Sequence, residues 1–241
     1  MTDGLPKVMQ VDPAPRPFSI AIAYSRLPLP MTRADQMTVA HLISFFAARG
    51  HAVDFYALDN GEEISPAHRQ WLETVCRSVH VFDHGPVRRL IGVLRGLMRG
   101  WPLQVGLFSN PAQTRAVRAG LGKVDIGYSY YIRSAETMRS LGRSRTRADG
   151  PVTFLAMQLS QALNTRRMAE HFRNLKEKLL YSVETRLVRN YEPRVWSDFT
   201  RTVLIGQQDV DEIAAACRDR GLPEIDNVVF GPHGVDVDRF A

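Results

Sequence analysis

Residues 18–58 read FSIAIAYSRLPLPMTRADQMTVAHLISFFAARGHAVDFYAL, and this stretch decides the fold. It opens on a nearly continuous apolar run, which is typical of a strand buried on both faces. Apolar residues then recur at helical spacing, at Val39, Leu42, Ile43 and Phe46. Gly50 follows the last turn, and a second apolar run begins at His51. This strand–helix–strand unit predicts a parallel sheet with a right-handed crossover.

The rest of the chain repeats the alternation. We expect further strands or extended segments at 78–85, 103–109, 124–130, 151–160 and 201–206, and one last strand with a Gly-rich exit within 228–240. We expect helices at 66–77, 86–101, 110–119, 135–141, 174–192 and 207–220. In the long helix, a core face is predicted from Leu175, Leu179, Val183, Leu187 and Tyr191, and Pro193 is expected to end the helix. The pattern predicts an α/β domain over residues 18–232, with a doubly wound, mostly parallel, Rossmann-like sheet of about seven to eight strands.

Composition narrows the class of protein. The chain has 241 residues, of which 44% are hydrophobic and 23% charged, as in soluble globular proteins. A net charge of +6 favours anionic partners. Nucleic acid is disfavoured, because the aromatic residues fall in apolar runs and form no stacking row. Cys76 and Cys217 lie far apart in helical patterns, which indicates buried thiols in a reducing compartment. No apolar run is long enough to span a bilayer, so we expect a cytoplasmic protein, with a flexible arm at 1–17.

Several common site motifs are absent from the sequence. There is no G-x-G-x-x-G after the first strand, no Gly-rich Lys-Ser/Thr phosphate loop and no G-x-S-x-G elbow. The histidines are scattered, so no metal site is expected. The sequence therefore displays no catalytic constellation.

The helix expected at 86–101 is amphipathic and basic. Its apolar stripe comprises Leu90, Val93, Leu94, Leu97 and Trp101. Arg88, Arg95 and Arg99 lie on the opposite side, with Arg89 beside them. Two interpretations stay open: a helix that lies on an anionic membrane through these arginines and Trp101, or a surface helix that packs on its own sheet.

Polar side chains gather where the predicted strands end, which is where parallel sheets bind ligands. The candidates for substrate binding are Arg26, Thr32, Arg33, Asp35, Gln36, Tyr130, Arg133, Ser134, Gln161, Asn164 and Arg166. Arginine suits phosphate or an acidic sugar, and the Asn, Gln and Asp side chains suit sugar hydroxyls. Each of these residues has the alternative role of a helix cap or a solvated loop residue, Asp35 in particular.

Three segments together resemble the N-terminal domain of family-4-type glycosyltransferases of the GT-B fold. The first is the stretch at 18–58, with its Pro-rich loop and a helix that ends in RGH. The second is SQALNTRRMAEHFRNLKEKLLYSVETRLVRNYE at 160–192. The third is RTVLIGQQDVDEI with VVFGPHGVDVDRF, although His233 stands where that family usually has Asn. The likeness is to enzymes that build exopolysaccharide and related surface glycans.

The resemblance implies a retaining, metal-independent transfer of a hexose from a nucleotide sugar to a glycan or lipid-linked acceptor. In that family this domain mainly binds the acceptor, and a second domain holds most of the donor site and a pair of glutamates. The resemblance makes residues 233–241 the start of a linker to such a domain, carried by this chain's longer form or by a partner. It implies that these 241 residues alone are inactive. The protein would be peripheral on the inner face of the cell membrane under the membrane interpretation of the helix at 86–101.

Two other functions remain open on the sequence. The chain could be a non-catalytic subunit that holds an acceptor at the membrane and recruits a donor-binding partner. It could also be a small-molecule-binding α/β protein without sugar chemistry, since a fold does not fix a function.

Overall fold

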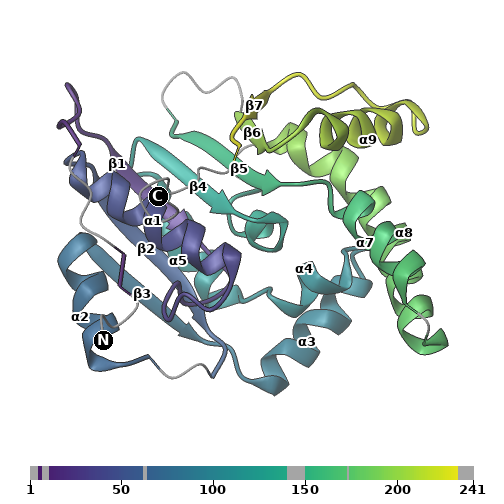
Figure 1. Ribbon diagram of the computed structural model, residues 1–241, viewed down its shortest axis with the longest axis horizontal. Coiled ribbons are helices and arrows are strands. Elements are labelled where there is room, and N and C mark those ends of the chain that lie inside the picture. The colour runs from purple at the N-terminus through teal and green to yellow at the C-terminus, as the bar shows by residue number, and fades with distance from the viewer. Residues whose placement is uncertain (1–4, 7–10, 62–63, 140–149, 173, 233–241) are drawn as a thin grey trace, which may run out of the picture.

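The computed structural model describes residues 5–6, 11–61, 64–139, 150–172 and 174–232. Its seven strands form one sheet in the order β3-β2-β1-β4-β5-β6-β7, and every pairing is parallel (Figure 1). The strands are β1 (Ser19–Ala23), β2 (Ala52–Asp59), β3 (Ser78–Asp83), β4 (Ile126–Tyr130), β5 (Val152–Gln158), β6 (Arg201–Leu204) and β7 (Val228–Phe230). This confirms the predicted doubly wound α/β sheet, whose order reverses between β1 and β4.

Helices cover both faces of the sheet. They are α1 (Ala34–Ala48), α2 (Pro66–Val75), α3 (Pro86–Leu97), α4 (Leu103–Leu107), α5 (Pro111–Leu121), α7 (Gln161–His171), α8 (Leu175–Val195) and α9 (Gln207–Arg218). Two 3₁₀ turns, η1 (Ile132–Thr137) and η2 (Trp196–Asp198), complete the described part of the chain. Beyond the carboxyl ends of the strands lie α3, α4 and the α7–α8 pair (Figure 1).

The core follows the alternation of side chains along β1. Ile20 and Ile22 face a cluster that includes Val39 and Ile43 of α1. Ala21 and Ala23 face the opposite cluster, which contains residues of α4, α5, η1, α8 and α9. Because successive side chains of a strand point to opposite faces, β1 is buried on both sides, as its continuous apolar run predicts.

The segment at 103–109 is the helix α4 and not the strand that its apolar residues suggest. Glycines explain the difference. A Cβ on Gly92 of α3 would lie 2.3 Å from the backbone oxygen of Gly106, so only the bare backbones allow α3 and α4 to touch. The carboxylate of Glu184 also accepts from the backbone N–H groups of Leu103 and Gln104, at 2.7 and 3.2 Å, and so caps α4 from across the fold.

Sequence patterns also misplace parts of the later chain. The helix α7 was not expected after β5, where Ser160 caps it by accepting from the N–H of Leu163. The turn η1 replaces the start of the helix expected at 135–141. The expected linker at 233–241 lies outside the described residues, as do residues 1–4 and 7–10 of the expected arm.

The predicted features of α8 were partly wrong. Pro193 does not end α8, because it lies in the last turn, where one backbone hydrogen bond is lost and the buried Val195 and Trp196 hold the chain in the core. The predicted core face is exposed over the first half of the helix, at Leu175, Leu179 and Val183. The α7–α8 pair extends past the sheet, so the core reaches only the second half of α8 (Figure 1).

Candidate functional site

Two arginines and one aspartate meet at the point where the strand order reverses. Arg26 follows β1, Arg133 follows β4, and Asp35 lies in the first turn of α1. A terminal nitrogen of Arg133 lies 3.0 Å from Oδ2 of Asp35, and Nε of Arg26 lies 3.6 Å from the same oxygen. Their side chains are only 7% (Arg26), 13% (Arg133) and 17% (Asp35) exposed. Three ionic groups, one of them about a hundred residues from the other two, thus share a largely desolvated position.

Aromatic rings hold the two guanidinium groups. The guanidinium carbons of Arg133 and Arg26 lie 4.9 and 5.5 Å from the ring centre of Phe108, which follows α4. Arg133 also lies 4.5 Å from the ring centre of Tyr131. Such contacts stabilise a cation and fix the plane of its hydrogen-bond donors.

The site has an excess of positive charge, since two guanidinium groups face one carboxylate. Burial lowers the pKa of Arg133, and the nearby charge of Arg26 lowers it further. Burial and the negative charge of Asp35 raise the pKa of the Tyr24 hydroxyl, so Tyr24 stays neutral. The electrostatics therefore favour an anion at this edge of the sheet.

A row of polar groups continues from this cluster toward β5. The Tyr131 hydroxyl accepts a 2.6 Å hydrogen bond from Nε2 of Gln161, and Oε1 of Gln161 lies 3.4 Å from Nε2 of Gln104. Tyr131 has φ 69° and ψ 150°, backbone angles that side-chain-bearing residues seldom adopt. Residues held in this region tend to occur at functional sites.

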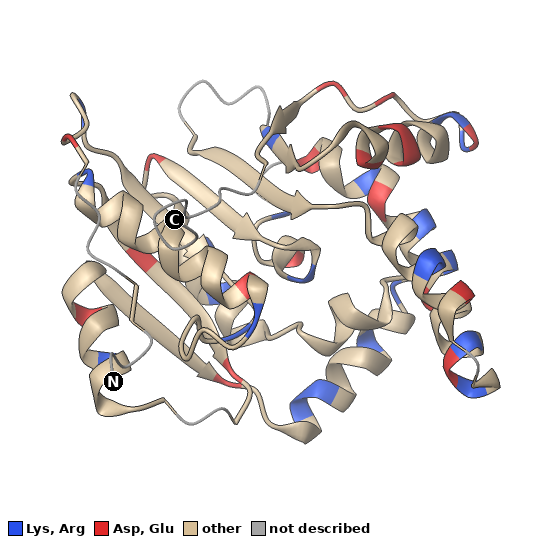
Figure 2. Ribbon diagram, viewed as in Figure 1, with Lys and Arg blue, Asp and Glu red and all other residues tan. Residues whose placement is uncertain are grey.

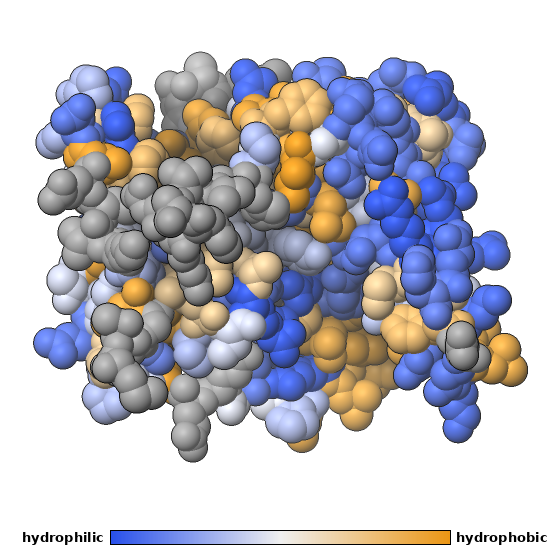
Figure 3. Space-filling model, viewed as in Figure 1, coloured by the Kyte–Doolittle hydropathy of each residue, from blue (hydrophilic) through white to orange (hydrophobic). Residues whose placement is uncertain are grey.

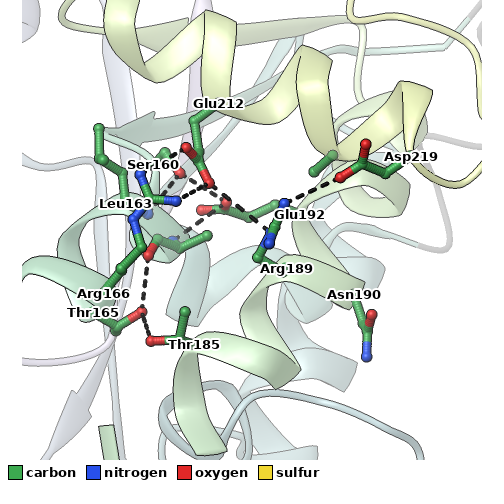
Figure 4. A network of polar contacts seen from close by, with 12 residues as sticks. Ser160, Leu163, Thr165, Arg166, Thr185, Arg189, Asn190, Glu192, Glu212 and Asp219 are labelled. Atoms are coloured by element: carbon green, nitrogen blue, oxygen red, sulfur yellow. Dashed lines mark hydrogen bonds and ion pairs between the residues drawn. The ribbon is translucent and has the colours of Figure 1, made fainter. Parts of the chain in front are cut away.

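A buried carboxylate supports the Gln161 end of this row. Glu192 of α8 is 1% exposed, and its oxygens accept from Oγ of Ser160 at 3.0 Å and from N of Gln161 at 2.5 Å (Figure 4). It therefore caps the N-terminus of α7. Burial raises the pKa of Glu192 to about 8, although the hydrogen bonds it accepts work in the opposite direction.

The structure brings together only some of the residues that the sequence suggested for substrate binding. Arg26, Asp35 and Arg133 meet, and Gln161 joins them through Tyr131. Tyr130 and Ser134, which are near Arg133 in sequence, are buried. Asp35 is not the N-cap of α1; Arg33 occupies that position and makes no side-chain capping hydrogen bond.

The remaining candidates lie apart from that cluster or support it. Gln36 donates to the carbonyl of Leu27 at 3.0 Å and accepts from Thr32 at 2.9 Å, so it braces the first loop. Thr32, Arg33 and Asn164 are exposed. Arg166 faces α9, where the carboxylate of Glu212 accepts hydrogen bonds from both of its terminal nitrogens, at 3.0 and 3.1 Å (Figure 4).

The residues that sequence reasoning missed are Tyr24, Tyr131, Phe108 and Gln104. Glu192 lies in the resembling segment at 160–192, where a structural role in the long helix is expected. Phe108 and Gln104 lie in the segment that reads as a strand, so nothing placed them at the mouth of the sheet. Tyr131 is adjacent to the candidate Tyr130, and the position after a strand end was the available signal. Glu192 lies 31 residues from Gln161 in sequence, and no periodicity links the two.

A second feature beside the site is an apolar surface on α3 and α8. Gly92 and Gly96 turn toward α4, which leaves the large apolar residues of α3 outside. We define the α3–α8 surface as the exposed side chains Val87, Leu90, Ile91, Leu94, Leu97 and Met98 of α3 with Leu175, Leu179, Leu180 and Val183 of α8. In Figure 3 apolar side chains gather in this lower right region, and Figure 2 shows basic residues along the same helices.

The basic residues of α3 have different surroundings. Arg89 donates to the backbone oxygens of His84 and Asn60, so it anchors two loops. Arg88 pairs with Asp83 at 3.1 Å. Arg95 and Arg99 are exposed, and Arg99 lies 5.1 Å from the ring centre of the half-buried Trp101. Trp101 packs against the core, so it does not belong to the α3–α8 surface.

Two hollows lie beside α7, away from the arginine cluster. One shallow hollow lies between α7 and α9 and another between α7 and α8, and both are wide open to solvent. Within the described residues, no cluster of three or more His, Cys, Asp or Glu side chains is arranged to hold a metal ion. In the same part of the chain, no helix has both the length and the apolar character needed to cross a bilayer.

Comparisons with known proteins give one distant likeness. No family model matches the chain, and no curated protein matches it. One similar solved structure is the apo UGT2 of Phytolacca americana, with a TM-score of 0.45 and 13% sequence identity. The similarity covers 93% of this chain and 54% of that one, so the chain spans about half the length of that structure.

Proposed function

We propose that this chain is the acceptor-side domain of a GT-B glycosyltransferase of the family-4 type. The reaction would transfer a hexose from a nucleotide sugar to a glycan or lipid-linked acceptor, with retention of configuration and without a metal ion. The retaining mechanism, the surface-glycan product and the assignment of the acceptor to this domain rest on the three resembling segments.

The observation that carries the proposal is the row formed by Arg26, Arg133, Tyr131 and Gln161 at the carboxyl ends of β1, β4 and β5. Its donors and aromatic rings match the hydroxyls, charged groups and apolar faces of an acidic or phosphorylated sugar. The nearby carboxylates are occupied: Asp35 pairs with arginine, and Glu192 caps α7. The donor site and the groups that complete catalysis would therefore come from a second domain on the same chain.

The α3–α8 surface supports a peripheral location on an anionic membrane. Exposed apolar side chains on two helices flank the mouth of the sheet, and Arg95 and Arg99 project from one of them. Insertion of the apolar side chains and attraction of the arginines to anionic lipid both favour binding. A lipid-linked acceptor would then enter the site from the bilayer.

Transfer is tested on the protein as its own cell makes it. Labelled nucleotide sugars are supplied with extracted lipid and glycan acceptors, and labelled product is counted. We expect product from the native protein. The rate of product formation should fall at least tenfold in Gln161→Leu and stay unchanged in Lys123→Ala, a position just before the amino end of β4. A folded native protein that releases no nucleotide with any donor and acceptor would contradict the proposal.

The alternative of a non-catalytic subunit is favoured by one observation, the extent of the α3–α8 surface beside a site without a free carboxylate among the described residues. The native protein distinguishes the two functions. If it binds the acceptor but transfers sugar only after a separate donor-binding protein is added, the subunit interpretation holds.

A further inference from the structure

The two arginines at the strand ends, Arg26 and Arg133, are incompletely hydrogen-bonded. The Nε atoms of Arg26 and Arg133 are buried and have no hydrogen-bond partner among the residues that the structure describes. Asp35 lies 3.6 Å from Arg26, which is longer than the usual 2.7–2.9 Å of a charge-assisted hydrogen bond. A buried guanidinium without full hydrogen bonding is unfavourable.

Arg166 and Glu212 provide a contrast within the same molecule. Their two hydrogen bonds, at 3.0 and 3.1 Å, use both terminal nitrogens of Arg166 and both oxygens of Glu212, and Nε of Arg189 lies 4.0 Å from the same carboxylate (Figure 4). Asp35 offers only one oxygen, Oδ2, to the two arginines of the site. Arg26 and Arg133 therefore keep donors that Asp35 does not satisfy, whereas both terminal nitrogens of Arg166 are satisfied.

The N-terminus of α1 adds positive potential at the same position. Asp35, which contacts both arginines, lies in the first turn of this 15-residue helix. The N-cap Arg33 is exposed and makes no side-chain capping hydrogen bond. The first N–H groups of a helix and its dipole favour anions, and phosphate in particular.

Serine hydroxyls at the same two strand ends are also buried without partners. Ser25 follows β1, Ser129 lies in β4 and Ser134 follows Arg133, and the Oγ of each lacks a hydrogen-bond partner among the described residues. Protein interiors leave few polar atoms unpaired, so such a concentration at one edge of a sheet indicates a ligand-binding region.

From these observations we propose that Arg26, Arg133 and the N-terminus of α1 bind a phosphate group. Two guanidinium forks and a helix terminus suit the tetrahedral, multiply charged oxygens of a phosphate better than the flat, singly charged carboxylate of an acidic sugar. The Phe108 ring lies against both guanidinium groups. If the proposed transferase function holds as well, the acceptor carries a phosphate; phosphate binding itself does not depend on that function.

The test measures binding of inorganic phosphate by calorimetry to the intact chain and to three variants. We expect Arg26→Gln and Arg133→Gln to weaken binding at least tenfold. Arg201→Gln makes the same charge change on an exposed residue at the amino end of β6 and should leave the affinity within twofold of the original. Equal affinities in all four proteins, or no binding at millimolar phosphate, would overturn the proposal.

Nuclear magnetic resonance keeps the test valid if a variant fails to fold. In the unmodified chain, the Nε–H signals of Arg26 and Arg133 should shift together on titration with phosphate, with one dissociation constant. Glucuronate should shift these signals with a dissociation constant at least tenfold higher than that of phosphate. A sugar phosphate, a nucleoside diphosphate and phosphatidylglycerol vesicles then distinguish the sources of the phosphate. Unshifted Nε–H signals, or a stronger response to glucuronate, would refute the assignment.

Discussion

The hydroxyl of Tyr131 accepts a 2.6 Å hydrogen bond from Nε2 of Gln161, and this contact joins the ends of β4 and β5. Tyr131 also has uncommon backbone angles, with φ 69°, and its side chain contacts both Arg133 and Gln161. The strained residue, the cation over its ring and the amide at its hydroxyl thus form one unit at the mouth of the sheet.

Tyr131→Phe removes this hydrogen bond and keeps the ring under Arg133. We expect the free energy of unfolding to fall by about 0.5–1.5 kcal/mol, measured by urea denaturation. Phosphate affinity should change less than twofold, because Arg133 retains its aromatic contact. Tyr181→Phe, in the exposed half of α8, is the control. A loss of phosphate binding in Tyr131→Phe would mean that the hydroxyl itself contacts the ligand.

Glu192 gives the protein a pH-dependent stability with a definite sign. Its pKa is about 8 in the folded chain and 4.5 as the reference value. Between these values the folded carboxyl holds a proton that the unfolded chain has lost, so the contribution of Glu192 to stability is full below 4.5 and is lost as the pH rises through 8. The slope is at most about 1.4 kcal/mol per pH unit.

Glu192→Gln replaces this group with a neutral one of the same shape. In urea denaturation from pH 5 to 9, the variant should gain stability relative to the unmodified protein as the pH rises. Glu170→Gln, an exposed site on α7, should show no such trend. A difference between Glu192→Gln and the unmodified protein that stays constant over this range would show that Glu192 is ionised throughout.

Glu184 caps α4 through two backbone N–H groups, and its removal tests why this segment is helical. Glu184→Ala should lower the free energy of unfolding by about 1–3 kcal/mol, because two donors lose their acceptor. Arg186→Ala, an exposed position on the same helix, should change it by less than about 0.5 kcal/mol. Equal effects of the two variants would argue against the cap.

The close contact between α3 and α4 predicts that a methyl group added at Gly92 destabilises the protein. Gly92→Ala should destabilise the protein by about 1–3 kcal/mol, since the new Cβ would overlap the Gly106 carbonyl. Gly122→Ala is a matched control, because its φ is −69° and nothing lies within 4 Å of an added Cβ. Thermal unfolding of both variants decides whether the helices touch.

Membrane binding is tested by flotation with vesicles that contain phosphatidylglycerol. Leu94→Glu puts a charge into the middle of the α3–α8 surface at an exposed position, so folding should survive while flotation falls several-fold. Phe45→Glu makes the same charge change on exposed α1 and should float like the unmodified protein. Equal flotation of both variants would refute the membrane location.

The sequence by itself determined the sheet and the positions of most of its elements. A strand such as β1, which is buried on both faces, must be apolar throughout. The start of a helix such as α5 is predicted by its N-cap, Asn110, and by Pro111 in its first turn. Because the carboxyl ends of parallel strands meet at one edge, the sequence also placed Arg26 and Arg133 in the same region.

Only the tertiary structure decided what these residues contact. The helical state of α4 depends on Gly92 of α3 and on Glu184 of α8, which lies 81 residues from Leu103, and a local pattern carries no information about such partners. The exposure of Leu94 and Leu179 has the same origin. Their spacing marks an apolar face, but whether that face meets the core depends on where neighbouring helices lie: glycines turn α3 toward α4, and α8 runs past the end of the sheet.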